Sequence, residues 1–66
     1  MKLETYCLYE IIGYEVYVTE TDSFKNANVI NVVADNEADA VKRAGEILVK
    51  PFYKIKSVTE YLVPAK

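Results

Sequence analysis

Hydrophobic and polar residues alternate along the first part of the chain, which is the pattern of strands that bury one face. Between Leu3 and Glu20, aromatic, aliphatic and β-branched residues are separated by single acidic residues. A strand of that length would span about 60 Å, which exceeds the width of so small a domain. Because glycine adopts the positive φ of a tight hairpin turn, we expect a turn at Gly13 between strands at 3–11 and 15–20.

The next segments predict a loop, a strand and a helix. Residues 21–28 are rich in Asp, Ser and Asn, whose side chains bond to nearby backbone, so we expect a loop there. Residues 29–33 are mostly β-branched and predict a third strand. Asp35 or Asn36 can then cap a helix. The helix presents one apolar stripe, formed by Ala40, Val41, Ala44, Ile47 and Leu48.

A final strand is predicted from 52 to 63, after Pro51 ends the helix. Strict alternation fails within it, because Ile55 and Val58 are three residues apart. A β-bulge near residues 56–57 would bring both side chains to the core face. The predicted inward-facing residues of this strand are Tyr53, Ile55, Val58 and Leu62.

These elements predict an α+β fold in a single compact domain over residues 1–66. Its antiparallel-dominated, four-stranded sheet has the order β-β-β-α-β, and one helix packs on one face. The last strand lies beside the first strand or beside the third, and the pattern allows either edge.

Composition argues against catalysis and against a membrane location. The chain contains no histidine, which removes the usual general base and most zinc sites. The single cysteine, Cys7, falls mid-strand on the core side, where we expect an inert small hydrophobe. We therefore predict no enzyme activity, no catalytic residue, no metal and no cofactor. Apolar runs are too short to span a bilayer, and the start lacks a signal-peptide pattern, so we expect a cytoplasmic protein.

Charge is unevenly distributed, although the net charge is only −2. Acidic residues dominate positions 1–24, and lysines dominate positions 50–66. We expect these charges to pair across neighbouring strands. The alternative is two surface patches of opposite sign.

Tyrosine is the most prominent excess, with six tyrosines and no tryptophan. We expect Tyr9, Tyr14 and Tyr53 on the core side, with their hydroxyls in water. The other three fall on the opposite face among aliphatic residues, where a sheet covered by one helix should be polar. This face predicts contact with a second molecule, either a foreign protein or a second copy of the chain. Its predicted partner-binding residues are Tyr6, Leu8, Tyr17, Val29, Val33 and Tyr61.

A second hypothesis is binding of nucleic acid. Lys50, Phe52, Lys54 and Lys56 combine basic and aromatic residues, as a stacking platform for a single strand does. Lysines on a strand edge also prevent aggregation, and no RNA-binding or zinc-finger signature accompanies them. Acidic residues of the first strand share the outer face, so nucleic acid is the disfavoured alternative.

The segments Tyr14–Glu20 and Val29–Val41 resemble small phage and plasmid proteins of the DpnD/PcfM-like family. In that pattern a strand ending in Thr-Glu leads to a strand ending in Val-x-Ala, and a Glu-Ala pair opens the helix. The resemblance covers less than half of the chain and includes no catalytic residues. It implies a mobile-element accessory protein that inhibits or modulates a host protein by steric occupation, as anti-CRISPR and anti-restriction proteins do.

Overall fold

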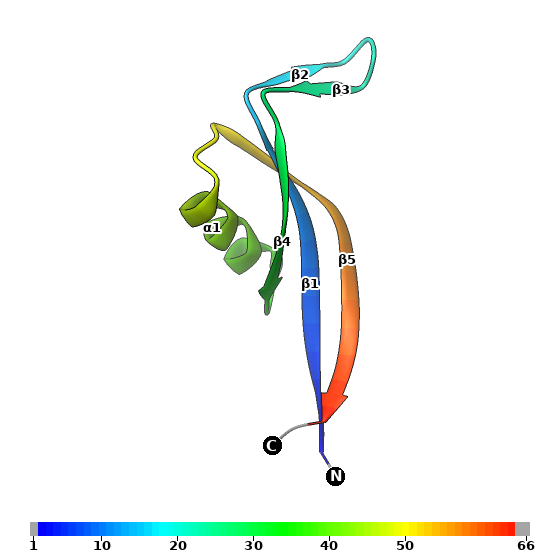
Figure 1. Ribbon diagram of the computed structural model, residues 1–66. Helices are drawn as coiled ribbons and strands as arrows, with labels where there is room; N and C mark the ends of the chain where they lie inside the picture. The colour runs from blue at the N-terminus through cyan, green and yellow to red at the C-terminus, as the bar shows by residue number, and fades with distance from the viewer. Residues whose placement is uncertain (1, 65–66) are drawn as a thin grey trace.

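Strand β1 lies at the centre of the computed structural model, which describes residues 2–64. It pairs with β4 on one side and with β5 on the other, both antiparallel, so the three-stranded sheet has the order β4-β1-β5 (Figure 1). A separate two-stranded hairpin and one helix complete the fold. The elements are β1 (Leu3–Tyr14), β2 (Val16–Val18), β3 (Ser23–Lys25), β4 (Asn28–Ala34), α1 (Glu37–Ile47) and β5 (Phe52–Pro64).

The α+β class, the mostly antiparallel pairing and the single helix are confirmed, but the sheet has three strands rather than four. The predicted turn at Gly13 is wrong, because β1 continues through it and φ of Gly13 is not positive. The molecule measures 49 × 23 × 15 Å, so its length accommodates the long strand. Gly13 instead permits close packing, since a Cβ there would lie 3.0 Å from Lys50 Cγ and 3.1 Å from Tyr53 Cε1.

The segment after β1 forms its own hairpin and does not return along β1. Strand β2 pairs with β3, and the Glu15 N–H donates a hydrogen bond to the Lys25 carbonyl oxygen at 3.2 Å. Asp22 and Asn26 have φ of 51° and 52°, a conformation that Asp and Asn tolerate better than most residues. Strand β3 lies where a loop was predicted. Its Phe24 ring packs edge-on against Tyr14, with centroids 4.7 Å apart, and this contact holds the segment extended.

The helix begins as predicted and buries less of its stripe than predicted. The Asn36 side chain accepts a hydrogen bond from the Asp39 N–H at 2.9 Å, which confirms the N-cap. Ala40 and Ala44 are fully buried against the sheet. Ile47 is exposed, and Leu48 has extended backbone beyond the helix end. The apolar contact of α1 is therefore centred on its small residues.

The core lies between α1 and one face of the sheet, which we call the helix side. Its buried residues are Tyr9, Ile11, Val32, Ala34, Ala40 and Ala44. Tyr53 packs against this core, so the predicted core-side position of Tyr9 and Tyr53 is confirmed. The prediction that the Tyr53 hydroxyl lies in water is wrong, because this hydroxyl bonds to the backbone of Leu48 and Lys50. Tyr14 lies on the other face, because an even-numbered position of β1 faces away from Ile11. There its ring stacks on Phe52, with centroids 5.6 Å apart.

The predicted bulge in β5 is confirmed. Glu10 lies opposite Ser57 and Ile11 lies opposite Ile55, so Lys56 is the additional residue. Val58 consequently returns to the helix side, where it lies opposite Tyr9. It is still exposed, as is Leu62, because α1 does not extend over this part of β5.

Candidate functional site

The far face is the side of the three-stranded sheet that points away from α1. Directly opposite residues of antiparallel strands share a face, and the register places Tyr6 opposite Tyr61 and Leu8 opposite Val33. Val29 lies on the same face, opposite Ile12. Five of the six predicted partner-binding residues therefore share one face of the sheet. These are Tyr6, Leu8, Val29, Val33 and Tyr61.

Tyr17, the sixth predicted residue, lies elsewhere. It belongs to β2 in the separate hairpin, where its ring centroid is 5.0 Å from that of Phe24. Its hydroxyl donates a hydrogen bond to Asp22 Oδ1 at 2.5 Å. This bond to a carboxylate is the main reason that the pKa of Tyr17 is raised. The misplacement follows from the predicted Gly13 turn, which would have folded β2 back onto β1.

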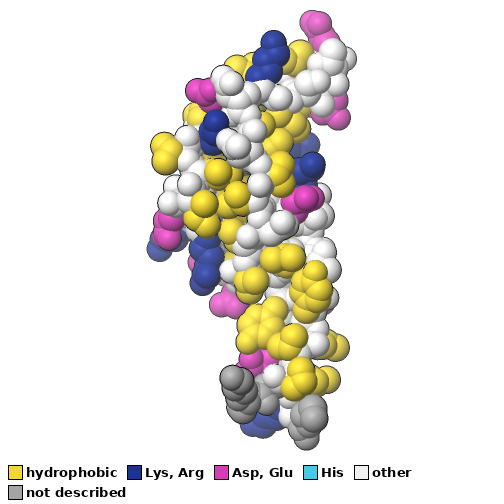
Figure 2. Space-filling view, viewed as in Figure 1, with side chains coloured by type: hydrophobic (Ala, Val, Ile, Leu, Met, Phe, Trp, Pro, Cys, Tyr) yellow, Lys and Arg dark blue, Asp and Glu magenta, His cyan; other side chains and the backbone are white. Residues whose placement is uncertain are grey.

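Beyond Cys7, which is opposite Ala34, β4 ends while β1 and β5 continue together. We call residues 3–6 and 61–64 the ribbon. Its side chains are exposed on both faces: Leu3 is 58% and Leu62 68% exposed on one, and Tyr6 is 41% and Tyr61 47% exposed on the other. Figure 2 shows hydrophobic side chains gathered at this end of the molecule. Leu3 and Leu62 were not among the predicted site residues. The signal in the sequence is that both segments of the ribbon carry apolar residues at odd and at even positions, and therefore on both faces.

Acidic groups surround the ribbon and the adjoining end of the sheet. The Tyr6 hydroxyl donates to Glu4 Oε2 at 2.7 Å, and this hydrogen bond raises the pKa of Tyr6. Burial is the main cause of a raised pKa at Tyr9. Negative charges near Tyr9 contribute to the same shift, and the carboxylates among them belong to Glu37, Asp35 and Glu60.

We expected acidic and basic side chains to pair across neighbouring strands, but the strand register places neutral residues opposite the acidic ones. Glu4 lies opposite Val63, and Glu60 lies opposite Cys7. Glu10 lies between Asn31 and Ser57, and the Ser57 hydroxyl donates to its Oε1 at 3.4 Å. The acidic side chains of the sheet therefore face neutral cross-strand neighbours and remain available to a binding partner.

The residues of the nucleic-acid hypothesis do not form one continuous surface. Phe52 and Lys54 are on the far face, where Lys54 Nζ lies 5.7 Å from the Phe24 ring centroid. The Lys50 stem packs over Gly13 on the helix side, and Lys56 is the bulge residue. Lys54 and Lys56 line a common hollow beside Phe24. The Lys50 stem lies on the helix side, so the full set does not make one surface along which a single strand could stack.

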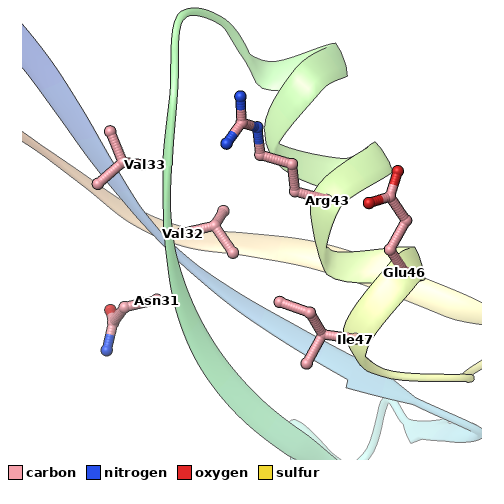
Figure 3. Close-up of a pocket in the computed structure, with 6 residues that line it drawn as sticks. All are labelled: Asn31, Val32, Val33, Arg43, Glu46 and Ile47. Carbon is pink, nitrogen blue, oxygen red and sulfur yellow. The ribbon is translucent and has the colours of Figure 1, made fainter.

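The hollow between α1 and the outer edge of β4 has a volume of about 360 Å³ and offers no evident chemistry (Figure 3). Its polar lining consists of the Asn31 amide, the Arg43 guanidinium and the Glu46 carboxylate. Within residues 2–64, no group of three acidic or cysteine side chains is placed to hold a metal ion. The lining residues are Asn31, Val32, Val33, Arg43, Glu46 and Ile47.

No protein-family model, curated protein or solved structure matches this chain. The resemblance to the DpnD/PcfM-like family thus stays a prediction from the residues that carry it. In the described part of the chain, α1 has neither the length nor the apolar character needed to cross a membrane.

Proposed function

We propose that this protein is a protein-binding module and that the far face of its sheet is the binding surface. The supporting observation is a continuous run of apolar side chains across three strands, in which Tyr61, Tyr6 and Val33 are exposed and Leu8 between them is half-buried. A sheet with a helix on one side normally presents polar residues on the other. Contiguous apolar patches mark interaction sites, and tyrosine is among the residues that contribute most to interface energy.

The mode of action that fits this surface is steric occupation of a partner. Binding that buries the far face would block whatever the partner presents there, and it requires no reaction. This is the behaviour expected of the small mobile-element inhibitors that the sequence resembles, with a host protein as the partner. A second copy of the chain is the competing occupant of the same face.

Photo-cross-linking tests the proposal directly. A benzophenone amino acid replaces Tyr61 on the far face or, as a control, Lys42 on the outer side of α1. We expect one protein to be captured from position 61 and not from position 42. Equal capture from both positions, or capture of nucleic acid from position 61, would contradict the proposal. Capture of the chain itself would identify a homodimer.

The captured partner then allows a quantitative test. Leu8→Glu introduces a charge at the centre of the far face, so we expect the Kd to rise by at least about tenfold. Thr19→Glu adds the same charge in the distant hairpin turn and should leave the Kd unchanged. Circular dichroism of both variants checks that each remains folded. A Kd that is insensitive to Leu8→Glu would remove the far face from consideration.

A further inference from the structure

Strand β1 has an unpaired edge within the ribbon. Strand β4 pairs with β1 only from Cys7 to Gly13, whereas β5 pairs with it from Leu3 onward. Between Leu3 and Tyr6, one side of β1 thus has no neighbouring strand among residues 2–64. In an antiparallel sheet, alternate residues direct both N–H and C=O to the same side. About two of these four residues therefore offer both groups to an incoming strand.

The outer edges of β4 and β5 carry features that discourage strand pairing. The outer edge of β4 borders the hollow beside α1, where Arg43, Glu46 and Ile47 of the helix lie next to it. On β5 these are the bulge at Lys56, the charge of Lys54 and the terminal Pro64. The Leu3–Tyr6 edge contains no proline, lysine or bulge. It is the edge of the sheet that is best suited to accept another strand.

Charge indicates what kind of strand fits. Glu4 lies on the far face of the ribbon, and Glu60 lies on the helix side next to it. Asp35 and Glu37 follow directly after β4, at the point where an added strand would begin. Lys2 is the single basic residue among the described positions at this end. The edge is therefore acidic on both faces, and it is bordered by exposed apolar side chains. These are Leu3, Tyr6, Tyr61 and Leu62.

We propose that the Leu3–Tyr6 edge binds an extended basic segment of the partner protein as an added strand. The segment lies in line with β4 and antiparallel to β1, and it alternates basic with apolar residues. Strand addition obtains affinity from main-chain hydrogen bonds and specificity from alternate side chains. Basic side chains of the segment lie near the carboxylates, and its apolar side chains cover the ribbon. This inference rests on the proposed function and adds the chemistry of the partner.

The probe is a short blocked peptide of alternating lysine and valine, added to the uniformly labelled protein and followed by NMR. We expect slowed amide hydrogen exchange at the open-edge residues among 3–6, and weaker binding at higher salt. A matched peptide of alternating glutamate and valine should bind at least about tenfold more weakly. Thr5→Lys places a positive charge on the edge and should weaken binding of the lysine peptide by about tenfold, whereas Thr19→Lys should not.

Other results would contradict strand addition at residues 3–6. Slowed exchange along the outer edge of β5, equal binding of both peptides, or no binding of the lysine peptide would overturn strand addition at this edge. Peptide contacts confined to Leu8 and Val33, with unchanged exchange at 3–6, would overturn it while supporting the far face as a binding surface. The cross-linking result at position 61 decides the proposed function independently of all of these.

Discussion

The Tyr53 hydroxyl donates a hydrogen bond to the backbone carbonyl oxygen of Leu48. The same hydroxyl accepts a hydrogen bond from the Lys50 N–H at 3.1 Å. One side chain of β5 thereby holds the segment between the end of α1 and the start of its own strand. The helix has no Gly cap, so this phenol supplies much of the order at its C-terminal end.

Tyr53→Phe removes this hydroxyl and leaves two partly buried backbone groups without that partner. We expect a loss of about 1–2 kcal/mol in the free energy of unfolding, measured by urea denaturation. Tyr61→Phe is the matched control, because Tyr61 lies exposed on the far face. It should change stability by less than about 0.5 kcal/mol. Equal losses in the two variants would show that the Tyr53 hydroxyl is not structural.

The two glycines should respond to alanine in opposite directions. A Cβ at Gly45 would meet only the Tyr53 hydroxyl oxygen, at 3.7 Å, which is an ordinary contact. Gly45→Ala should therefore stabilise the helix by about 0.5–1 kcal/mol. Gly13→Ala should destabilise by about 1–3 kcal/mol, because its Cβ would lie too close to Lys50 and Tyr53. Thermal unfolding of both variants measures the difference, and a shift of the same sign would contradict this packing.

The buried side of α1 can be tested with a charge. Ala44 is fully buried against the sheet, and Ala44→Asp would place an unpaired carboxylate there. We expect a loss of several kcal/mol, which is a large part of the stability of a domain this small. Lys42→Asp, on the exposed side of the same helix, should cost far less. A melting temperature unchanged by Ala44→Asp would mean that another side of the helix faces the sheet.

Stability should decrease at alkaline pH because three phenols have raised pKa values in the folded chain. Burial is the main cause at Tyr9, and hydrogen bonds to carboxylates are the main causes at Tyr6 and Tyr17. A phenol with a raised folded pKa binds its proton more tightly when folded, so it adds stability below about pH 10. This contribution is lost as pH rises through the folded pKa. Tyr9→Phe should show a shallower alkaline loss in melting temperature, and a loss identical to that of the parent would contradict the assignment.

Oligonucleotide binding separates the two functional hypotheses. We expect no measurable affinity for a mixed-sequence single strand at physiological salt, because Lys50 lies on the helix side and the carboxylate of Asp22 lines the hollow that Lys54 and Lys56 share. Fluorescence anisotropy measures this. Binding whose log affinity falls with log salt by about 0.7 per phosphate contact would support the nucleic-acid hypothesis. Its loss in the double variant Lys54→Glu, Lys56→Glu would locate the contact.

The sequence pattern correctly predicted the elements that depend on interactions between residues close to one another in the chain. A cap at Asp35 or Asn36, the helix after it and the strand before it follow from side-chain chemistry within a few residues, and the structure places the cap at Asn36. The bulge at Lys56 was predictable because it alone returns Val58 to the same side as Ile55. Five residues of the candidate surface were predicted from the alternation of side chains between the two faces of a strand.

Pairing between distant segments was not predictable in this way. The Gly13 turn was inferred from an assumed globular width, and the elongated molecule does not meet that assumption. Strand β3 depends on the packing of Phe24 against Tyr14 and Tyr17, a contact that no local pattern of Asp, Ser and Asn indicates. Tyr17 was assigned to the candidate surface for the same reason, because its position depended on which strand β2 would join.

The central position of β1 also governs how the chain must fold. Both partners of β1 come later in the sequence, and the pairing of Leu3 with Pro64 joins residues from nearly opposite ends of the chain. Non-local contacts of this kind slow folding to the millisecond-to-second range typical of proteins with high contact order. The β2–β3 hairpin and α1 need only local contacts and can form first, whereas β1 remains without its hydrogen-bonded neighbours until β4 and β5 arrive. A kinetic experiment should therefore find that substitutions along the β1–β5 pairing change the folding rate more than substitutions in the hairpin do.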